Sequence, residues 1–483
     1  MFSAFSNIYS KYYDKYVEPH PVNKLWDRLD RKVAGNATTL TRADIILCAV
    51  MGIIGIVVSL WAFAQTERVP GINTYMSIFL QSDVGRVAEN LVTPSGNHSR
   101  TAVHPISSIL LTPIGYVLTA LGLSPIAAAK AMTVAICGAN VALFAATVRL
   151  LGLPRYAMAL FTALFMASAC FLFWGSVIEL FPFAGFTIIL SLFLLAYTRP
   201  LKAVWWVVLN ILTLGITTTN WTAGLIATAA RHRLKSFFAI ATIALGAVGV
   251  LSIIQNPLFE KAAYFFNPIP LMRETNYTQP SMQAKGDYET GWNPITNLRS
   301  MYITTVIGMP DEVQQQNTIE LVTSNQTSGF PKGEFSPVIA TAAWVVLFGL
   351  GVWGAISHRP LRTVAIGVGA MLAFQTLLHS VYGEVTFLYS WHFMPMILLV
   401  AAFSWFSRYR WVAVGLAVTV IIFGGINNIN RLQSTIDTAG CLAQLDSVKT
   451  YQSWDLIKTE PSRDTAKTYP PLPTADIERC RAL

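Results

Sequence analysis

The chain has little charge. Only 12% of its 483 residues are Asp, Glu, Lys or Arg, whereas 53% are apolar and the mean hydropathy is +0.49. Soluble domains carry about 25% charged residues. Half that share, with apolar runs of about 20 residues between short polar gaps, excludes a water-soluble domain for the bulk of the chain. It predicts an all-α polytopic membrane protein.

The chain also lacks the motifs of several functional classes. It has no Walker loop, no dinucleotide-binding glycine fingerprint and no Cys/His cluster with metal-ligand spacing. No inverted repeat of the kind found in transporters is visible. The net charge of +9 does not indicate nucleic-acid binding, because the basic residues occupy short loops and no basic patch with interleaved aromatics is present.

Cysteine is scarce, with five residues in all. Cys48, Cys137 and Cys170 fall in apolar segments, where a free thiol behaves as a small hydrophobic side chain. Cys441 and Cys480 fall in the polar C-terminal region. These two could form a disulfide if that region faces an oxidising compartment, or they could remain as two thiols.

The polar gaps between the apolar runs are of two alternating kinds. One kind is basic: Arg149 and Arg155, Arg199 and Lys202, Arg231–Arg233 with Lys235, Arg359 and Arg362, Arg408 and Arg410. Basic loops mark the cytoplasmic side of a membrane protein. The other kind holds carboxylates, Asn and His: Asp83, His104, Glu179, Asn220, Glu384 and His392. This second set therefore gathers at the extracytoplasmic surface, which predicts a reaction centre there.

The alternation predicts about eleven transmembrane helices, with the N-terminus inside and the C-terminus outside. The expected spans are 43–64, 126–148, 156–173, 178–198, 203–218, 220–231, 236–255, 337–357, 363–381, 388–406 and 411–427. Residues 1–42, which show no cleavable signal peptide, form a cytoplasmic segment, 43–430 the transmembrane domain and 431–483 an extracytoplasmic tail. Outer loops are expected over 65–125, with an interfacial helix at 106–122, and over 256–336 with short local helices.

Asp83 and Arg86 are the first candidates for chemistry. Three positions apart on a helix, they share a face, so the carboxylate could take a proton from a hydroxyl beside a cation. A solvated loop ion pair is the plainer alternative. His104 precedes Pro105 at the start of an apolar helix, where it could bind a phosphate or a sugar hydroxyl or simply mark the helix boundary.

The other candidates lie at the outer ends of later spans. Glu179 follows Trp174, and an ionisable residue so close to hydrocarbon is costly and therefore a functional candidate, unless Trp174 only anchors the span and Glu179 reaches water. Asn220 ends a run of three threonines, which suits sugar binding or a helix break. Glu384 and His392 flank the segment FLYSW. Tyr389 and Trp391 within it, together with His392, could stack on or hydrogen-bond a sugar, or form part of an aromatic belt.

Taken together, these features resemble the GT-C superfamily of integral-membrane glycosyltransferases, including the bacterial enzymes that use polyprenyl-phosphate sugars. The resemblance rests on a first span, an outer loop with Asp83, the His104-Pro105 step into an apolar juxtamembrane helix, and Glu179 after the third span. It covers about residues 43–430, and its motifs are short. The segment FLYSWHF is also similar to such proteins, though less specifically.

The resemblance implies transfer of a sugar from a lipid phosphate to a hydroxyl of an extracytoplasmic polysaccharide, lipid or protein, with inversion at the anomeric carbon. Asp83 would be the general base, and Arg86, His104, Glu179, Asn220, Glu384, Tyr389 and His392 would bind substrate. Many members carry Asp-x-Asp or Asp-Glu in this loop, whereas here Val84 follows a lone Asp83. We therefore expect no required metal or other cofactor. The implied location is the bacterial inner (plasma) membrane.

Two other readings remain open: a flippase or transporter, and a polymerase or ligase of lipid-linked saccharides. A transporter would place ionisable residues near the bilayer midplane, whereas these cluster at span ends. A polymerase would favour paired arginines in the outer loops, and no clear pair is evident in the sequence.

Overall fold

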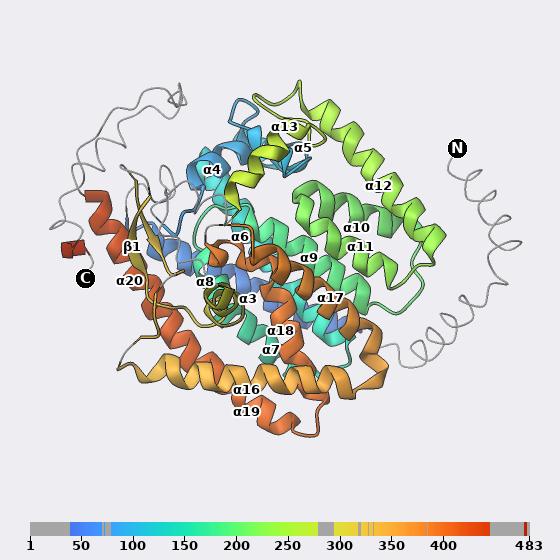
Figure 1. Cartoon of the computed structure of the whole chain (residues 1–483), viewed down its shortest axis with the longest axis vertical. Helices are drawn as coiled ribbons and strands as arrows, with labels where there is room; N and C mark the ends of the chain where they lie inside the picture. The colour runs from blue at the N-terminus through green and yellow to red at the C-terminus, as the bar shows by residue number, and fades with distance from the viewer. Residues whose placement is uncertain are drawn as a thin grey trace, which may run out of the picture.

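The computed structural model describes residues 39–69, 72, 79–278, 294–316, 320–326, 328–331, 333–383, 385–444 and 478–480. Helices dominate this part of the chain (Figure 1), as the composition predicted. The expected cytoplasmic segment 1–42 lies outside the described residues except for 39–42.

Among the described residues, six helical segments are long and apolar enough to cross a membrane. They are α3 (Arg42–Thr66), α6 (Pro125–Leu150), α12 (Leu234–Gln255), α16 (Phe335–Ser357), η5–α17 (Arg359–His379) and α19–α20 (Arg410–Ala443). A seventh results if η6 (Thr386–His392) and the helix Met394–Phe406, which contains α18 (Met394–Ala402) and η7 (Phe403–Phe406), form one span bent by 61°. The expected membrane-embedded helical architecture is thus present, but six or seven spans are supported by length and composition instead of eleven.

The remaining predicted spans are shorter helices. They are α7 (Arg155–Ala167) with α8 (Ala169–Trp174), α9 (Phe181–Ala196), α10 (Ala203–Ile216) and α11 (Trp221–Ala229). The break between α7 and α8 falls at Ser168, whose backbone is extended. There the backbone N–H groups of Ala169 and Cys170 donate to the carbonyls of Val306 and Thr305, at 3.1 and 2.9 Å. A broken helix is tolerated in such a position because the freed backbone groups are satisfied within the protein.

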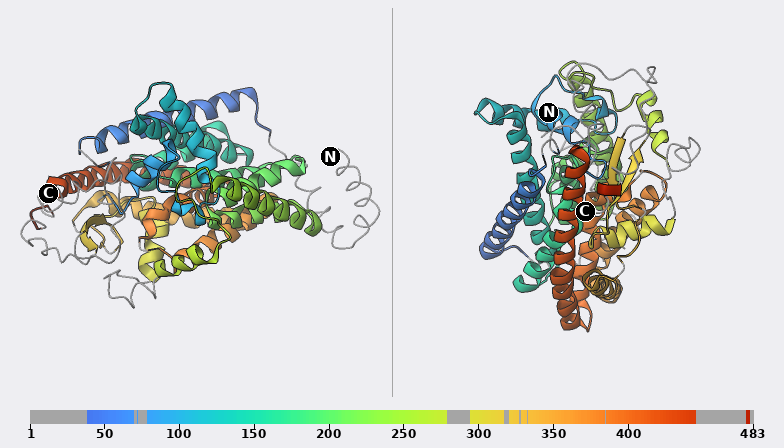
Figure 2. Two further views of the ribbon diagram at one scale, coloured as in Figure 1. Left: turned by 90° about the horizontal axis from the view of Figure 1, so that it is seen from above. Right: turned by 90° about the vertical axis from the view of Figure 1, so that its left-hand side faces the viewer.

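Helices α3 and α6 form the first packed pair of the bundle. Asp44 at the start of α3 accepts from Arg149 (3.0 Å) and Arg155 (2.9 Å), and at the opposite ends Lys130 pairs with Glu67 (2.6 Å). These pairs fix the two helices antiparallel. Gly138 allows the close approach, since a Cβ there would lie 2.9 Å from the carbonyl oxygen of Gly52. The outer face of α3 exposes Ile46, Ile53 and Val57, and Figure 2 shows this helix along the edge of the bundle.

The segment predicted to form the first outer loop, 65–125, contains α4 (Val84–Val92), the 3-10 turn η1 (Ser99–Ala102) and α5 (Ser107–Ala120). Helix α5 contains Pro113 and exposes Ile114, Tyr116 and Val117, as an interfacial helix would. It packs closely on α4, because a Cβ on Gly115 would lie 2.0 Å from the carbonyl oxygen of Leu91. Figure 1 shows α4, α5 and α13 (Pro268–Arg273) toward the top of the molecule.

The polar segment 256–336 contains the predicted short helices and one unpredicted feature. The helices are α13, η3 (Glu274–Tyr277), α15 (Pro294–Arg299) and the π-turn η4 (Ser300–Thr304). The strands β1 (Glu312–Gln316) and β2 (Glu320–Ser324) pair antiparallel as a hairpin, which the all-helical expectation did not include. Part of the segment enters the bundle, since Met301, Val306 and Ile307 are buried.

The last long helix continues beyond the predicted end of the transmembrane domain. Helix α19 (Arg410–Thr419) passes through the π-turn η8 (Val420–Gly424) into α20 (Gly425–Gln444), so residue 431 falls inside a helix. The sequence predicts a polar tail from residue 431, but Leu432, Ile436, Ala439 and Leu442 form a buried stripe along one face of this helix. Cys441 near its end is disulfide-bonded to Cys480, with a Cα–Cα distance of 5.5 Å.

Peptide mapping of the unreduced protein should recover a linked peptide containing Cys441 and Cys480. Cys48, Cys137 and Cys170 are free and buried, so they should react with an alkylating reagent only after denaturation. Recovery of Cys441 and Cys480 as alkylated thiols from native, unreduced protein would contradict the structure.

Candidate functional site

Residues from distant parts of the chain line one cavity of about 250 Å³. The first outer loop contributes one wall, the turn between α8 and α9 a second, and the ends of α10 and α17 together with η3 and η6 complete it. The polar lining side chains are Asp83, Arg86, Arg100, His104, Glu179, Thr217, Thr218, Thr219, Glu274, His379, Tyr382, Tyr389 and His392. Six of the eight residues predicted from the sequence are in this set.

The other two predicted residues have different positions. Asn220, at the end of η2 (Thr218–Asn220), is fully buried and lies behind the cavity wall, where it contacts His392. Glu384 lies outside the described residues. Trp174 is also fully buried and donates to the carbonyl of Phe387 at 3.0 Å, so it is not an exposed interfacial anchor.

Asp83, Arg86 and Glu179 form the acidic corner of the cavity. Asp83 precedes α4, and its side chain is 58% exposed and pairs with Arg86 one turn along that helix. Glu179 is only 2% exposed. Its carboxylate accepts from the backbone N–H of Asp83 and from that of Leu180, the latter at 3.1 Å. The buried carboxylate of Glu179 therefore fixes the backbone of Asp83, whose own carboxylate is accessible.

The two carboxylates differ in ionisation. Burial raises the pKa of Glu179, and the negative charge of Asp83 raises it further, to about 8. Desolvation also acts upward on the pKa of Asp83, but the charge and hydrogen bond of Arg86 outweigh it, so that pKa lies below its ordinary value. Near neutral pH the corner therefore holds one ionised carboxylate open to the cavity and one protonated carboxyl group beneath it.

His104 lies beside this corner. Its Nδ1 is 2.8 Å from the carbonyl oxygen of Ile216. Desolvation lowers the pKa of His104 to about 3, and the positive charge of Arg100 acts in the same direction. His104 is therefore a neutral ring at physiological pH, and it cannot serve as a cation for a phosphate.

The sequence did not single out the cluster of Arg100, Glu274 and Tyr382. Arg100 forms a two-pronged ion pair with Glu274, at 2.5 and 3.3 Å, and the Tyr382 hydroxyl donates to the same carboxylate at 2.6 Å. The cluster joins the first outer loop to η3 and to the segment after α17. Each residue lies in a polar stretch without periodicity, so no sequence signal distinguished it from an ordinary loop residue.

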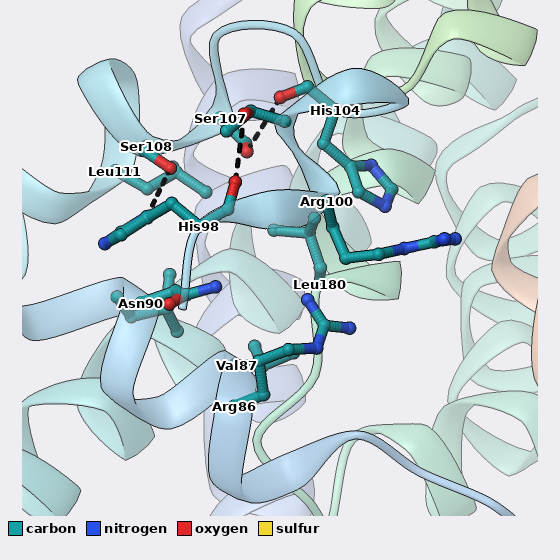
Figure 3. Close-up of a pocket in the computed structure, with 12 residues that line it drawn as sticks. Arg86, Val87, Asn90, His98, Arg100, His104, Ser107, Ser108, Leu111 and Leu180 are labelled. Atoms are coloured by element: carbon teal, nitrogen blue, oxygen red, sulfur yellow. Dashed lines mark hydrogen bonds between the residues drawn. The ribbon is translucent and has the colours of Figure 1, made fainter. Parts of the chain in front are cut away.

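A smaller pocket of about 30 Å³ adjoins the main cavity and shares five lining residues with it: Arg86, Val87, Arg100, His104 and Leu180. Figure 3 shows Arg86 and Arg100 on either side of Leu180, extending in the same direction, with the His104 ring near Arg100. The two guanidinium groups thus face one region. Each also pairs with a carboxylate, so the local positive charge is partly compensated.

Within the described residues, no three His, Cys, Asp or Glu side chains are grouped as metal ligands. The lining instead combines hydroxyl, imidazole and guanidinium groups with apolar side chains such as Leu180, Phe181, Leu378 and Leu388. This composition suits a ligand that has hydroxyl groups, an anionic group and an apolar portion.

Comparison with protein-family models, with curated proteins and with solved structures finds no match to this chain. The GT-C resemblance therefore remains a prediction from the residues described above.

Glu179→Gln should flatten the dependence of thermal stability on pH. Between about 4.5, its ordinary pKa, and about 8, Glu179 binds more protons in the folded than in the unfolded protein. Stability from this group therefore falls as pH rises through that window. We expect the melting temperature of the parent to fall more steeply between pH 5 and 8 than that of the variant.

The quantity to compare is the difference between the pH–melting-temperature curves of the parent and of the variant. Burial also raises the pKa of Asp311 to about 8, but Asp311 is present in both proteins and therefore contributes equally to both curves. Parallel curves would show that Glu179 is ionised throughout.

Proposed function

We propose that this protein is a membrane glycosyltransferase that moves a sugar from a polyprenyl-phosphate donor to a hydroxyl of an extracytoplasmic polysaccharide, lipid or protein. One observation supports this most: the exposed carboxylate of Asp83 shares a cavity with two guanidinium groups, those of Arg86 and Arg100. A base for the acceptor and cations for the donor phosphate are then available in one place.

In the proposed reaction, Asp83 takes the proton of the acceptor hydroxyl. The acceptor oxygen bonds to the anomeric carbon, and the bond from that carbon to the carrier phosphate oxygen breaks on the opposite face, which inverts the centre. The phosphate leaves with the bonding electrons as a dianion, so it needs cations and no acid. Arg86 and Arg100 supply that charge, and the reaction requires no metal or other cofactor.

The positions of the ionisable residues favour an enzyme over a flippase or transporter. Asp83 and Glu179 lie between helices and Arg100 lies in the short 3-10 turn η1, so none is in the middle of a candidate span. A transporter uses such groups near the bilayer midplane.

A polymerase or ligase of lipid-linked saccharides is the second candidate. The sequence shows no obvious arginine pair, but the fold brings Arg86 and Arg100 to one cavity. Two guanidinium groups could hold two lipid phosphates, one on each reacting saccharide. The two candidates differ in whether a base is required.

Asp83→Asn should reduce transfer by about 10²–10⁴-fold, the usual effect of removing a general base. The amide keeps the shape of the side chain but cannot take a proton. The assay would measure transfer from a panel of short isoprenoid-phosphate sugars in nanodiscs.

Glu89→Gln is the matched control, because Glu89 is a carboxylate on the same helix, α4, and does not line the cavity. Its turnover should match that of the parent. Near-normal turnover of Asp83→Asn, with loss in Arg86→Gln and Arg100→Gln, would instead support the polymerase or ligase.

Sidedness can be tested by cysteine labelling in intact cells. Ser95 and Ser357 are both exposed. Ser95 lies just after α4 in the predicted first outer loop, and Ser357 lies at the end of α16. A membrane-impermeant maleimide should label Ser95→Cys directly and Ser357→Cys only after permeabilisation. Labelling of both from the same side would contradict the proposed topology.

A further inference from the structure

Two of the three histidines that line the cavity, His104 and His392, have proton positions fixed by their hydrogen-bond partners. The His104 Nδ1 lies 2.8 Å from the Ile216 carbonyl oxygen, and a carbonyl can only accept. Nδ1 must therefore carry the hydrogen. Because the neutral ring has one N–H, its Nε2 is a bare acceptor.

For His392 the same conclusion follows through Asn220. The amide nitrogen of Asn220 donates to the Ala184 carbonyl at 3.0 Å, which fixes the orientation of the amide group. The amide oxygen then faces His392 Nδ1 at 2.7 Å. Since that oxygen can only accept, Nδ1 of His392 also carries the hydrogen, and its Nε2 is bare when the ring is neutral.

These two bare nitrogens are available to a ligand. Within the described part of the chain, no hydrogen bond engages Nε2 of either ring, and both residues line the cavity. His98 differs in this respect. Its Nε2 donates to the Thr93 carbonyl at 3.0 Å and its Nδ1 lies 2.7 Å from the Ser108 hydroxyl, so both nitrogens are used internally.

We infer that His104 and His392 bind a hydroxyl-rich sugar by accepting hydrogen bonds from two of its hydroxyl groups. That the ligand is a sugar rests on the proposed function, whereas the proton positions do not. A sugar carboxylate at either contact would place an acceptor against an acceptor. The two rings therefore select hydroxyl groups over carboxylates at the positions they contact.

The proton positions can be measured without any substrate. Long-range ¹H–¹⁵N spectra of histidine-labelled protein in nanodiscs at neutral pH should show Nδ1–H rings for His104 and His392 and an Nε2–H ring for His98. Single His→Asn variants assign the signals. An Nε2–H ring or an imidazolium at His104 or His392 would overturn the inference.

Binding provides the second test, with farnesyl-phosphate derivatives of neutral pentoses and hexoses, their monodeoxy analogues and the corresponding uronic acids. Removal of a contacted hydroxyl should weaken binding to the parent by about 3- to 10-fold, the range of one neutral hydrogen bond. In His392→Asn, which keeps the donor to Asn220 but has no Nε2, that hydroxyl should no longer matter. His104→Asn should behave in the same way toward a different hydroxyl.

His358→Asn is the matched control, since His358 stacks on Phe406 and does not line the cavity. It should bind every probe as the parent does. If deoxy sugars and uronic acids bind as tightly as the parent sugars, the acceptor pair is wrong although the proposed function can stand. If no farnesyl-phosphate sugar binds, the sugar assignment and the proposed function both fail. The proton positions are then tested only by the ¹H–¹⁵N spectra.

Discussion

A hydrogen bond between two parts of the chain that are 96 positions apart holds the candidate site together. The backbone N–H of Asp83 donates to the Glu179 carboxylate, which ties the first outer loop to the turn between α8 and α9. Because Glu179 is buried, this bond forms in a low-dielectric environment, where losing either partner would leave an unpaired polar group. The position of the exposed Asp83 carboxylate therefore depends on a second carboxyl group, which is itself buried.

The cavity exists because several helices around it end early. Helices α9, α10 and α11 are shorter than a membrane span, and the backbone after α10 is extended at Thr217. The polar loops fill the space above them only in part. The first outer loop is held there by the Arg100–Glu274–Tyr382 cluster and by the close contact of α5 with α4 at Gly115. Polar loop residues therefore occupy the space beyond the ends of α9, α10 and α11, where longer helices would place apolar side chains.

The sequence singled out Glu179 because an ionisable residue beside hydrocarbon is costly, and Asp83 because it shares a helix face with Arg86. The structure brings both to one cavity. The sequence did not indicate Arg100 or Glu274, because charged residues are common in polar loops. Only the tertiary structure shows that these two form an ion pair. Long apolar helices were recognisable, but the break at Ser168 depends on carbonyls of residues 305 and 306, far away in sequence. The buried stripe of α20 was hidden because its other face is polar.

The continuous helix α19–α20 is longer than a bilayer requires. Its 34 residues extend roughly 51 Å at 1.5 Å per residue, against a hydrocarbon thickness of about 30 Å. The excess does not project freely, because Leu432, Ile436, Ala439 and Leu442 pack the far half of the helix against the protein. Cys441 lies near the end of that half, and its disulfide partner Cys480 is fully buried, so the covalent link clips residues 478–480 onto the bundle. A dissolved reductant would reach this bond only where that contact opens.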